Sequence, residues 1–128
     1  MKLFSIDEAN SLLPRIRMKL DMIRRHYEVV SAHRETARAA AAASQFGGGM
    51  EGGARYVQAL YDIGKLATEI TEAGVQLKDH ERGLIDFPSM QGGRVVLLCW
   101  QLGEPDSIEW FHELDAGFAG RQPISRLH

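Results

Sequence analysis

The sequence contains a single cysteine, Cys99, and this scarcity excludes an intramolecular disulfide. It also has no apolar run long enough for a signal peptide or for a helix that spans a membrane. Both absences are typical of a protein of the reducing cytoplasm, which is where we expect this one. A length of 128 residues, of which 45% are hydrophobic, predicts a single domain over residues 1–128.

A strong basic charge is also missing. The net charge is -2, and neither residues 1–74 nor residues 75–128 carry the positive excess that nucleic-acid binding uses. The basic residues between Arg15 and Arg25 fit the solvated face of a helix. We therefore expect no membrane and no nucleic acid as partner, which leaves other proteins or a second copy of this chain.

Residues 1–74 have the pattern of a helical hairpin. Ser5 and Glu8 fit a capping box, which predicts a helix from Ile6 to about Ser44, with Pro14 kinking or restarting its first turns. A second helix is predicted to end at Gly74. Each helix carries an apolar seam with the alternating spacing of a coiled coil. The seam of the first helix is Ala9, Leu13, Ile16, Leu20, Ile23, Tyr27, Val30, Ala37 and Ala41, broken by Arg34, and that of the second is Tyr56, Leu60, Ile63, Ala67 and Ile70.

The glycine-rich segment 45–53 separates the two predicted helices. A loop that cradles phosphate follows a strand and ends with a lysine and a hydroxyl, whereas this segment follows a helix and has neither. We interpret it as a flexible connector.

The predicted helices differ in length. At about 1.5 Å per residue the first extends nearly 60 Å and the second about 30 Å. Leu13, Ile16 and Leu20 of the longer helix therefore need another surface to cover them. Either the C-terminal part of the chain or a second copy can provide it, and the second option predicts a self-associating interaction module, most simply a homodimer.

From Val75 onward the apolar period changes from helical to alternating. The pattern predicts strands at residues 75–78, 84–87, 94–101 and 107–112, with turns at Gly92-Gly93 and at residues 103–106. The predicted fold class is α+β. It consists of a long antiparallel helical hairpin (1–74), followed by a three- to four-stranded antiparallel β-meander and an irregular tail (75–128).

The residues that carry chemistry gather in this second part. If the turn after residue 101 centres between Glu104 and Pro105, Cys99 lies opposite Trp110, and His112 is its diagonal neighbour on one face. Similar arithmetic for the preceding turn places Asp86 near Arg94 or Val95, away from Cys99.

Three interpretations of Cys99 and His112 follow. The first is that both are core residues, since free cysteine is among the most buried residue types. The second is a metal site, suited to zinc, built from Cys99 and His112 with Glu104 or Asp86, although it lacks paired-ligand spacing. The third is a thiol nucleophile activated by His112, which the acidic residues nearby oppose. Between the two functional interpretations we favour the metal site.

Three segments together point to a family. They are residues 4–10 with Leu13-Pro14, residues 83–88, and residues 98–100 with Gly103-Glu104 and Trp110. They resemble a small bacterial family known only as domain of unknown function twenty-two hundred and three. The resemblance spans almost the whole chain and implies a bacterial source and a single domain. It implies no activity, cofactor or catalytic residue.

Overall fold

The computed structural model describes residues 1–42 and 52–127. Helix α1 spans Ile6–Ala42 and helix α2 spans Gly53–Glu72. Five strands follow, β1 (Gln76–Asp79), β2 (Leu84–Gln91), β3 (Arg94–Gln101), β4 (Trp110–Glu113) and β5 (Gln122–Pro123), with 3-10 turns η1 (Phe118–Gly120) and η2 (Ile124–Arg126). The strands form one antiparallel sheet in the order β1-β2-β3-β4-β5. The predicted α+β class is confirmed, with one strand more than expected.

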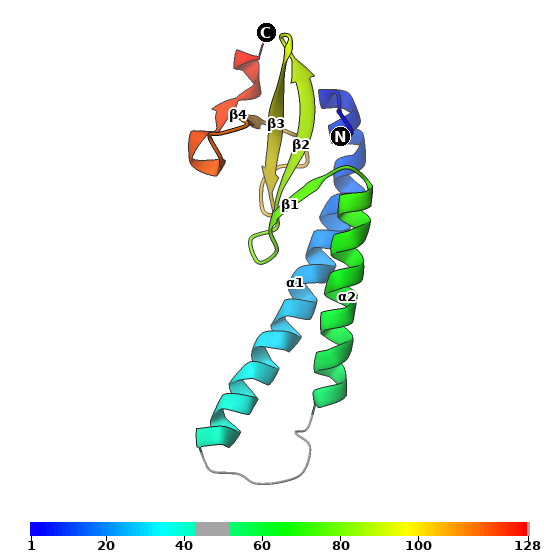
Figure 1. The fold of residues 1–128 in the computed structure, drawn as a ribbon, viewed down its shortest axis with the longest axis vertical. Coiled ribbons are helices and arrows are strands. Elements are labelled where there is room, and N and C mark those ends of the chain that lie inside the picture. The colour runs from blue at the N-terminus through cyan, green and yellow to red at the C-terminus, as the bar shows by residue number, and fades with distance from the viewer. Residues whose placement is uncertain (43–51, 128) are drawn as a thin grey trace.

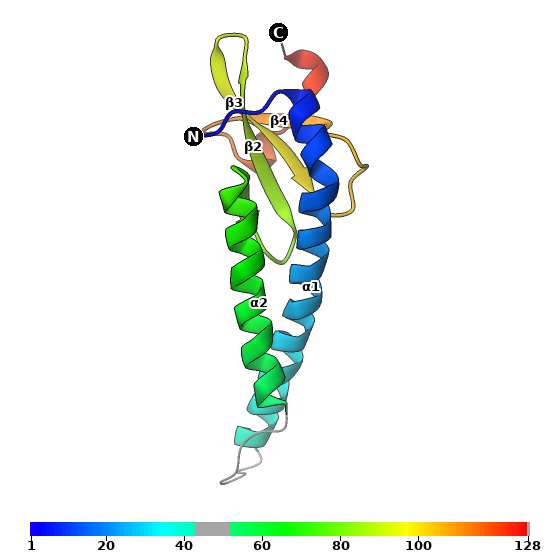
Figure 2. The ribbon, with the colours of Figure 1, turned by 90° about the vertical axis from the view of Figure 1, so that its right-hand side faces the viewer.

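The predicted helical hairpin forms, but its α2 seam is partly wrong, because Leu60 is exposed and Leu66 is buried instead. Ser5 and Glu8 exchange the two hydrogen bonds of a capping box at the start of α1, and the helix continues through Pro14. Helices α1 and α2 pack side by side in opposite directions (Figures 1 and 2), and His33 stacks on Tyr56 near the far end of the hairpin. Most of the predicted glycine-rich connector lies outside the described residues. Within those residues, neither helix is long and apolar enough to cross a membrane.

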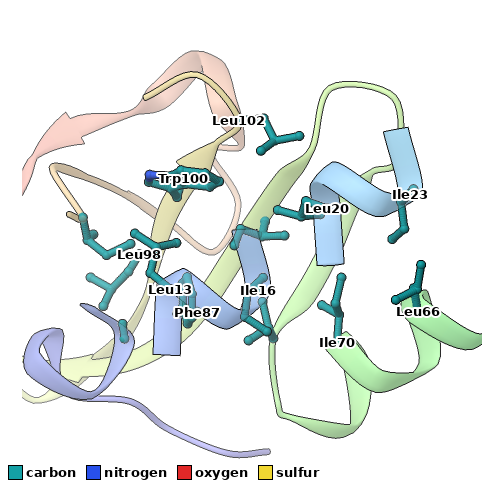
Figure 3. Close-up of a cluster of buried hydrophobic side chains, with 14 of the residues drawn as sticks. Leu13, Ile16, Leu20, Ile23, Leu66, Ile70, Phe87, Leu98, Trp100 and Leu102 are labelled. Atoms are coloured by element: carbon teal, nitrogen blue, oxygen red, sulfur yellow. The ribbon is translucent and has the colours of Figure 1, made fainter. Parts of the chain in front are cut away.

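The first half of α1 packs against the sheet. Leu13, Ile16 and Leu20 are fully buried, and they lie beside Phe87, Leu98 and Trp100 in the core that Figure 3 shows. The apolar length of α1 that exceeds its hairpin partner is thus covered within one chain. The sequence-based reason for expecting a homodimer is removed, because the C-terminal sheet is the surface that these residues needed.

Strand β2 is longer than the predicted strand at residues 84–87, because Pro88 does not interrupt it. The carbonyl of Pro88 accepts a hydrogen bond from the backbone N–H of Phe4, outside the ladder with β3. In an antiparallel strand the N and O of one residue point to the same side, so the N–H that proline lacks is not needed by β3. Strand β2 can therefore pair with β3 along its whole length.

The β2-β3 turn sets the register of the site. Gly92 and Gly93 both have positive φ, 59° and 79°, as the two central residues of a tight hairpin turn require. Gln91 therefore pairs with Arg94, and the ladder places Asp86 directly opposite Cys99. The predicted position of Asp86, near Arg94 or Val95, is wrong by several residues.

Candidate functional site

Asp86, Cys99 and His112 meet on the face of the sheet that points away from the helices. Asp86 pairs with Cys99 across β2 and β3, while His112 of β4 pairs with Leu97, two residues before Cys99. Side chains alternate along a strand, so these three share one face and the core residues Phe87, Leu98 and Trp100 share the other. Figure 1 shows that the chain after β4 lies on the side of the sheet opposite the helices.

All three side chains are buried, with 2% of Asp86, 1% of Cys99 and 3% of His112 exposed. Within the part of the chain that is described, they form the one group of three or more ligand-type residues close enough to share an ion. Their candidate ligand atoms all lie within 4.8 Å of one another. The register predicted for Cys99 with Trp110 and for Leu97 with His112 is confirmed.

The imidazole of His112 is held at both nitrogens. Nδ1 lies 2.8 Å from the backbone carbonyl oxygen of Glu113, and Nε2 lies 3.1 Å from Oδ2 of Asp86. Because a carbonyl oxygen only accepts, Nδ1 must carry a hydrogen and donate it to Glu113. The contact between Nε2 and Oδ2 then needs one further proton. The bond to Glu113 thus leaves Nε2 as the nitrogen that faces Asp86.

The two carboxylate oxygens of Asp86 differ in their hydrogen-bond partners. While Oδ2 faces His112, Oδ1 is buried without a hydrogen-bond partner. A buried acceptor left unpaired costs about 1–3 kcal/mol and calls for an explanation in each native structure where it occurs. A bound cation would give Oδ1 the partner that it lacks.

The thiol of Cys99 is poorly suited to nucleophilic attack. Burial, and then the negative charge of Asp86, raise the pKa of Cys99 to about 12. A reactive cysteine needs a lowered pKa and an accessible sulfur, and Cys99 has neither. The geometry therefore disfavours the thiol-nucleophile interpretation.

Native Cys99 is expected to resist alkylation by iodoacetamide at pH 8. With a pKa of about 12, only about one thiol in ten thousand is ionised at this pH, against about one in ten for an ordinary cysteine. The rate, followed by mass spectrometry, should be about a thousandfold below that of the same protein in urea. A native rate equal to the unfolded rate would show an exposed, ionised thiol.

Glu104, also predicted as a ligand, is placed elsewhere. Its carboxylate accepts hydrogen bonds from the guanidinium of Arg121 and from the backbone N–H of Gln101. It does not belong to the group that Asp86, Cys99 and His112 form. Of the four predicted ligands, the fold brings three together and uses the fourth to hold Arg121.

A pocket of about 250 Å³ opens beside the three side chains. Its other lining residues are Lys78, Leu84, Leu97, Leu114, Gly117 and Phe118. The guanidinium groups of Arg82 and Arg121 lie over the ring of Phe118, at 4.5 Å and 4.6 Å from its centre. Sequence reasoning missed Phe118 and Arg121, because a tail with only short helical turns gives no periodic signal. It also missed Lys78, although the strand that carries it was predicted.

A helical hairpin packed on an antiparallel sheet, with an Asp-Cys-His group on the opposite face of that sheet, defines an α+β protein with a metal-type ligand set. The chain belongs to the family described as uncharacterized conserved protein (DUF2203), whose model matches residues 2–124. The predicted resemblance is thereby confirmed. No match was found among curated proteins or among solved structures.

Proposed function

We propose that this protein binds a divalent transition-metal ion, zinc in the first instance, through Asp86, Cys99 and His112. The observation that carries the proposal is the buried convergence of a carboxylate, a thiol and an imidazole within 4.8 Å, with Oδ1 of Asp86 unpaired. These are the three ligand types that zinc takes in proteins, at about 2.0–2.3 Å from the ion. A closing movement of under about 1 Å per side chain would bring the group to those distances.

The surroundings of His112 support the same assignment. Histidine ligands commonly donate their second ring N–H to a carbonyl or carboxylate, which fixes the tautomer and directs the free nitrogen at the metal. The bond from Nδ1 of His112 to Glu113 has this form, so Nε2 is the nitrogen available for an ion. The bidentate pair of Arg94 with the Glu113 carboxylate further holds this strand end in place.

Self-association and a cytoplasmic location stay predictions from the sequence. The sheet of the same chain covers the apolar residues of α1 that suggested a homodimer. We therefore propose metal binding ahead of self-association.

Cobalt titration of metal-free protein tests the proposal. We expect one Co²⁺ per chain, with thiolate-to-cobalt charge-transfer absorption that added Zn²⁺ abolishes because zinc binds such sites more tightly. Asp86→Asn, Cys99→Ser and His112→Gln should each weaken Co²⁺ binding by more than about 100-fold, since even loss of a residue that only orients a ligand costs about 10–100-fold.

Two carboxylates serve as controls in this titration. Glu104→Gln should bind Co²⁺ within about tenfold of the unmodified protein, because Glu104 contacts Arg121 and not the metal group. Glu109→Gln, on an exposed residue, should leave binding unchanged. Protein that takes up no Co²⁺, or that keeps the charge-transfer band after Cys99→Ser, would refute the proposed site.

A further inference from the structure

The proposed metal site, formed by Asp86, Cys99 and His112, has room for one more ligand. Zinc in proteins is usually four-coordinate, and three protein ligands leave one position open, as in sites that bind water or substrate. The pocket of about 250 Å³ is lined by the same Asp86, Cys99 and His112, so the open position faces it. What the pocket can hold therefore follows from its size, its walls and its charge.

The pocket is small and its walls are mostly apolar. Its volume of about 250 Å³ lies just below the range of about 300–1,000 Å³ that is usual for pockets of drug-sized ligands, which favours a small ligand. Four of its walls are apolar side chains, namely Leu84, Leu97, Leu114 and Phe118. A ligand that fills it has a short apolar body.

The charge around the open position favours an anion. An ionised Cys99 and an ionised Asp86 balance a divalent ion, so the loaded metal group is neutral. Lys78 lines the pocket, and within the described residues its ammonium forms no ion pair. The carboxylates nearest to Lys78 in the sequence, Asp79 and Glu81, do not line the pocket, and Oδ1 of Asp79 accepts two backbone N–H bonds.

Two arginines lie behind Phe118, which is one of the lining residues. Arg82 and Arg121 both lie over the ring of Phe118. Arg121 is neutralised by Glu104, whereas Arg82 bonds to the side-chain oxygen of Gln101, which carries no charge. Among the described residues that line the pocket, Lys78 is thus the cation without an ion pair, and its charge would stabilise a negative ligand group there.

We propose that the pocket takes a small monocarboxylate with a short apolar chain. Its carboxylate completes the coordination of the metal ion and lies near Lys78, while its chain contacts Leu84, Leu97 and Phe118. This inference rests on the proposed function, because without the ion the open position does not exist.

Cobalt-loaded full-length protein with sodium butyrate as the probe tests the inference. We expect a saturable change in the visible cobalt spectrum with butyrate, and none with butanol or butylamine at equal concentration. Across acetate, propionate and butyrate the affinity should rise about fourfold per added methylene, as burial of each group against apolar walls predicts. Lys78→Met should weaken butyrate binding about two- to fivefold, and Lys65→Met, an exposed lysine on α2, should not change it.

The outcomes distinguish the proposed carboxylate ligand from the proposed metal site on which it depends. Protein that forms no cobalt complex refutes the metal site itself. A cobalt complex whose spectrum ignores butyrate, or responds equally to butanol, leaves the metal site standing and refutes the carboxylate ligand. Equal affinity for acetate and butyrate would refute the role of the apolar walls.

Discussion

Trp100→Ala is expected to lower the free energy of unfolding by about 4 kcal/mol, within the range of about 3–5 kcal/mol for removal of a buried large aromatic side chain. Trp100 is 1% exposed and lies between β3 and the first half of α1, beside Leu13 and Ile16 (Figure 3). Its Nε1–H also donates to the carbonyl of Pro105 at 2.8 Å, and that acceptor would lose its partner. Urea unfolding followed by circular dichroism measures the change.

Trp110→Ala is the matched control. Trp110 is half-buried on the opposite face of the sheet, where Arg121 lies over its ring at 4.9 Å. Truncating it removes less buried area and leaves the helix-sheet core intact, so we expect less than half the loss seen for Trp100. If Trp110→Ala cost as much as Trp100→Ala, the packing of α1 on the sheet would not be the main source of stability.

The hairpin could be predicted from the sequence because its signals are local. The Ser5 to Glu8 capping box and the apolar seams depend on spacings of three and four residues, and they need no knowledge of distant contacts. The surface that covers Leu13, Ile16 and Leu20 is formed by residues far away in the sequence. The length argument limited the answer to the sheet or a second copy, and only the fold decides that the sheet covers them.

The sequence predicted the positions of Cys99 and His112 in the site but not that of Asp86, which again depends on long-range contacts. Centring the turn between Glu104 and Pro105 gave the correct register of β3 with β4, although β4 begins at Trp110 and not at residue 107 as predicted. The position of Asp86 failed because it depends on β2 running through Pro88 to the glycine turn. Proline usually argues against a continuous strand. Here the contact of Phe4 with the Pro88 carbonyl shows that the missing N–H faces away from β3, which no local pattern reveals.

Zinc is expected to stabilise the protein more strongly as the pH rises from 6 to 8. Binding must displace the proton of Cys99, whose pKa of about 12 keeps it protonated throughout this window. Because one proton leaves Cys99 on binding, the apparent affinity for zinc rises tenfold per pH unit. At fixed free zinc this adds about 1.4 kcal/mol of stabilisation per pH unit. Thermal unfolding at buffered free zinc measures the gain.

The metal-free protein should show the opposite trend at higher pH. The pKa of Cys99 is raised in the folded state from an ordinary value near 9, so its contribution to stability is complete below about pH 9. It is then lost as the pH rises toward 12, because the unfolded thiol ionises first. Cys99→Ser should remove both trends, since serine neither ionises in this range nor supplies a thiolate.

Asp86→Asn separates a metal ligand from a structural partner of His112. The amide of asparagine can donate to Nε2 of His112 with no extra proton, so the metal-free variant should keep its stability within about 1 kcal/mol. Asp86→Ala leaves Nε2 of the buried imidazole without a partner and should cost about 1–3 kcal/mol. Neither variant should gain stability from zinc. If Asp86→Asn were stabilised by zinc as strongly as the unmodified protein, with the same rise between pH 6 and 8, Asp86 would not be a ligand, and the pairing with His112 would be its whole role.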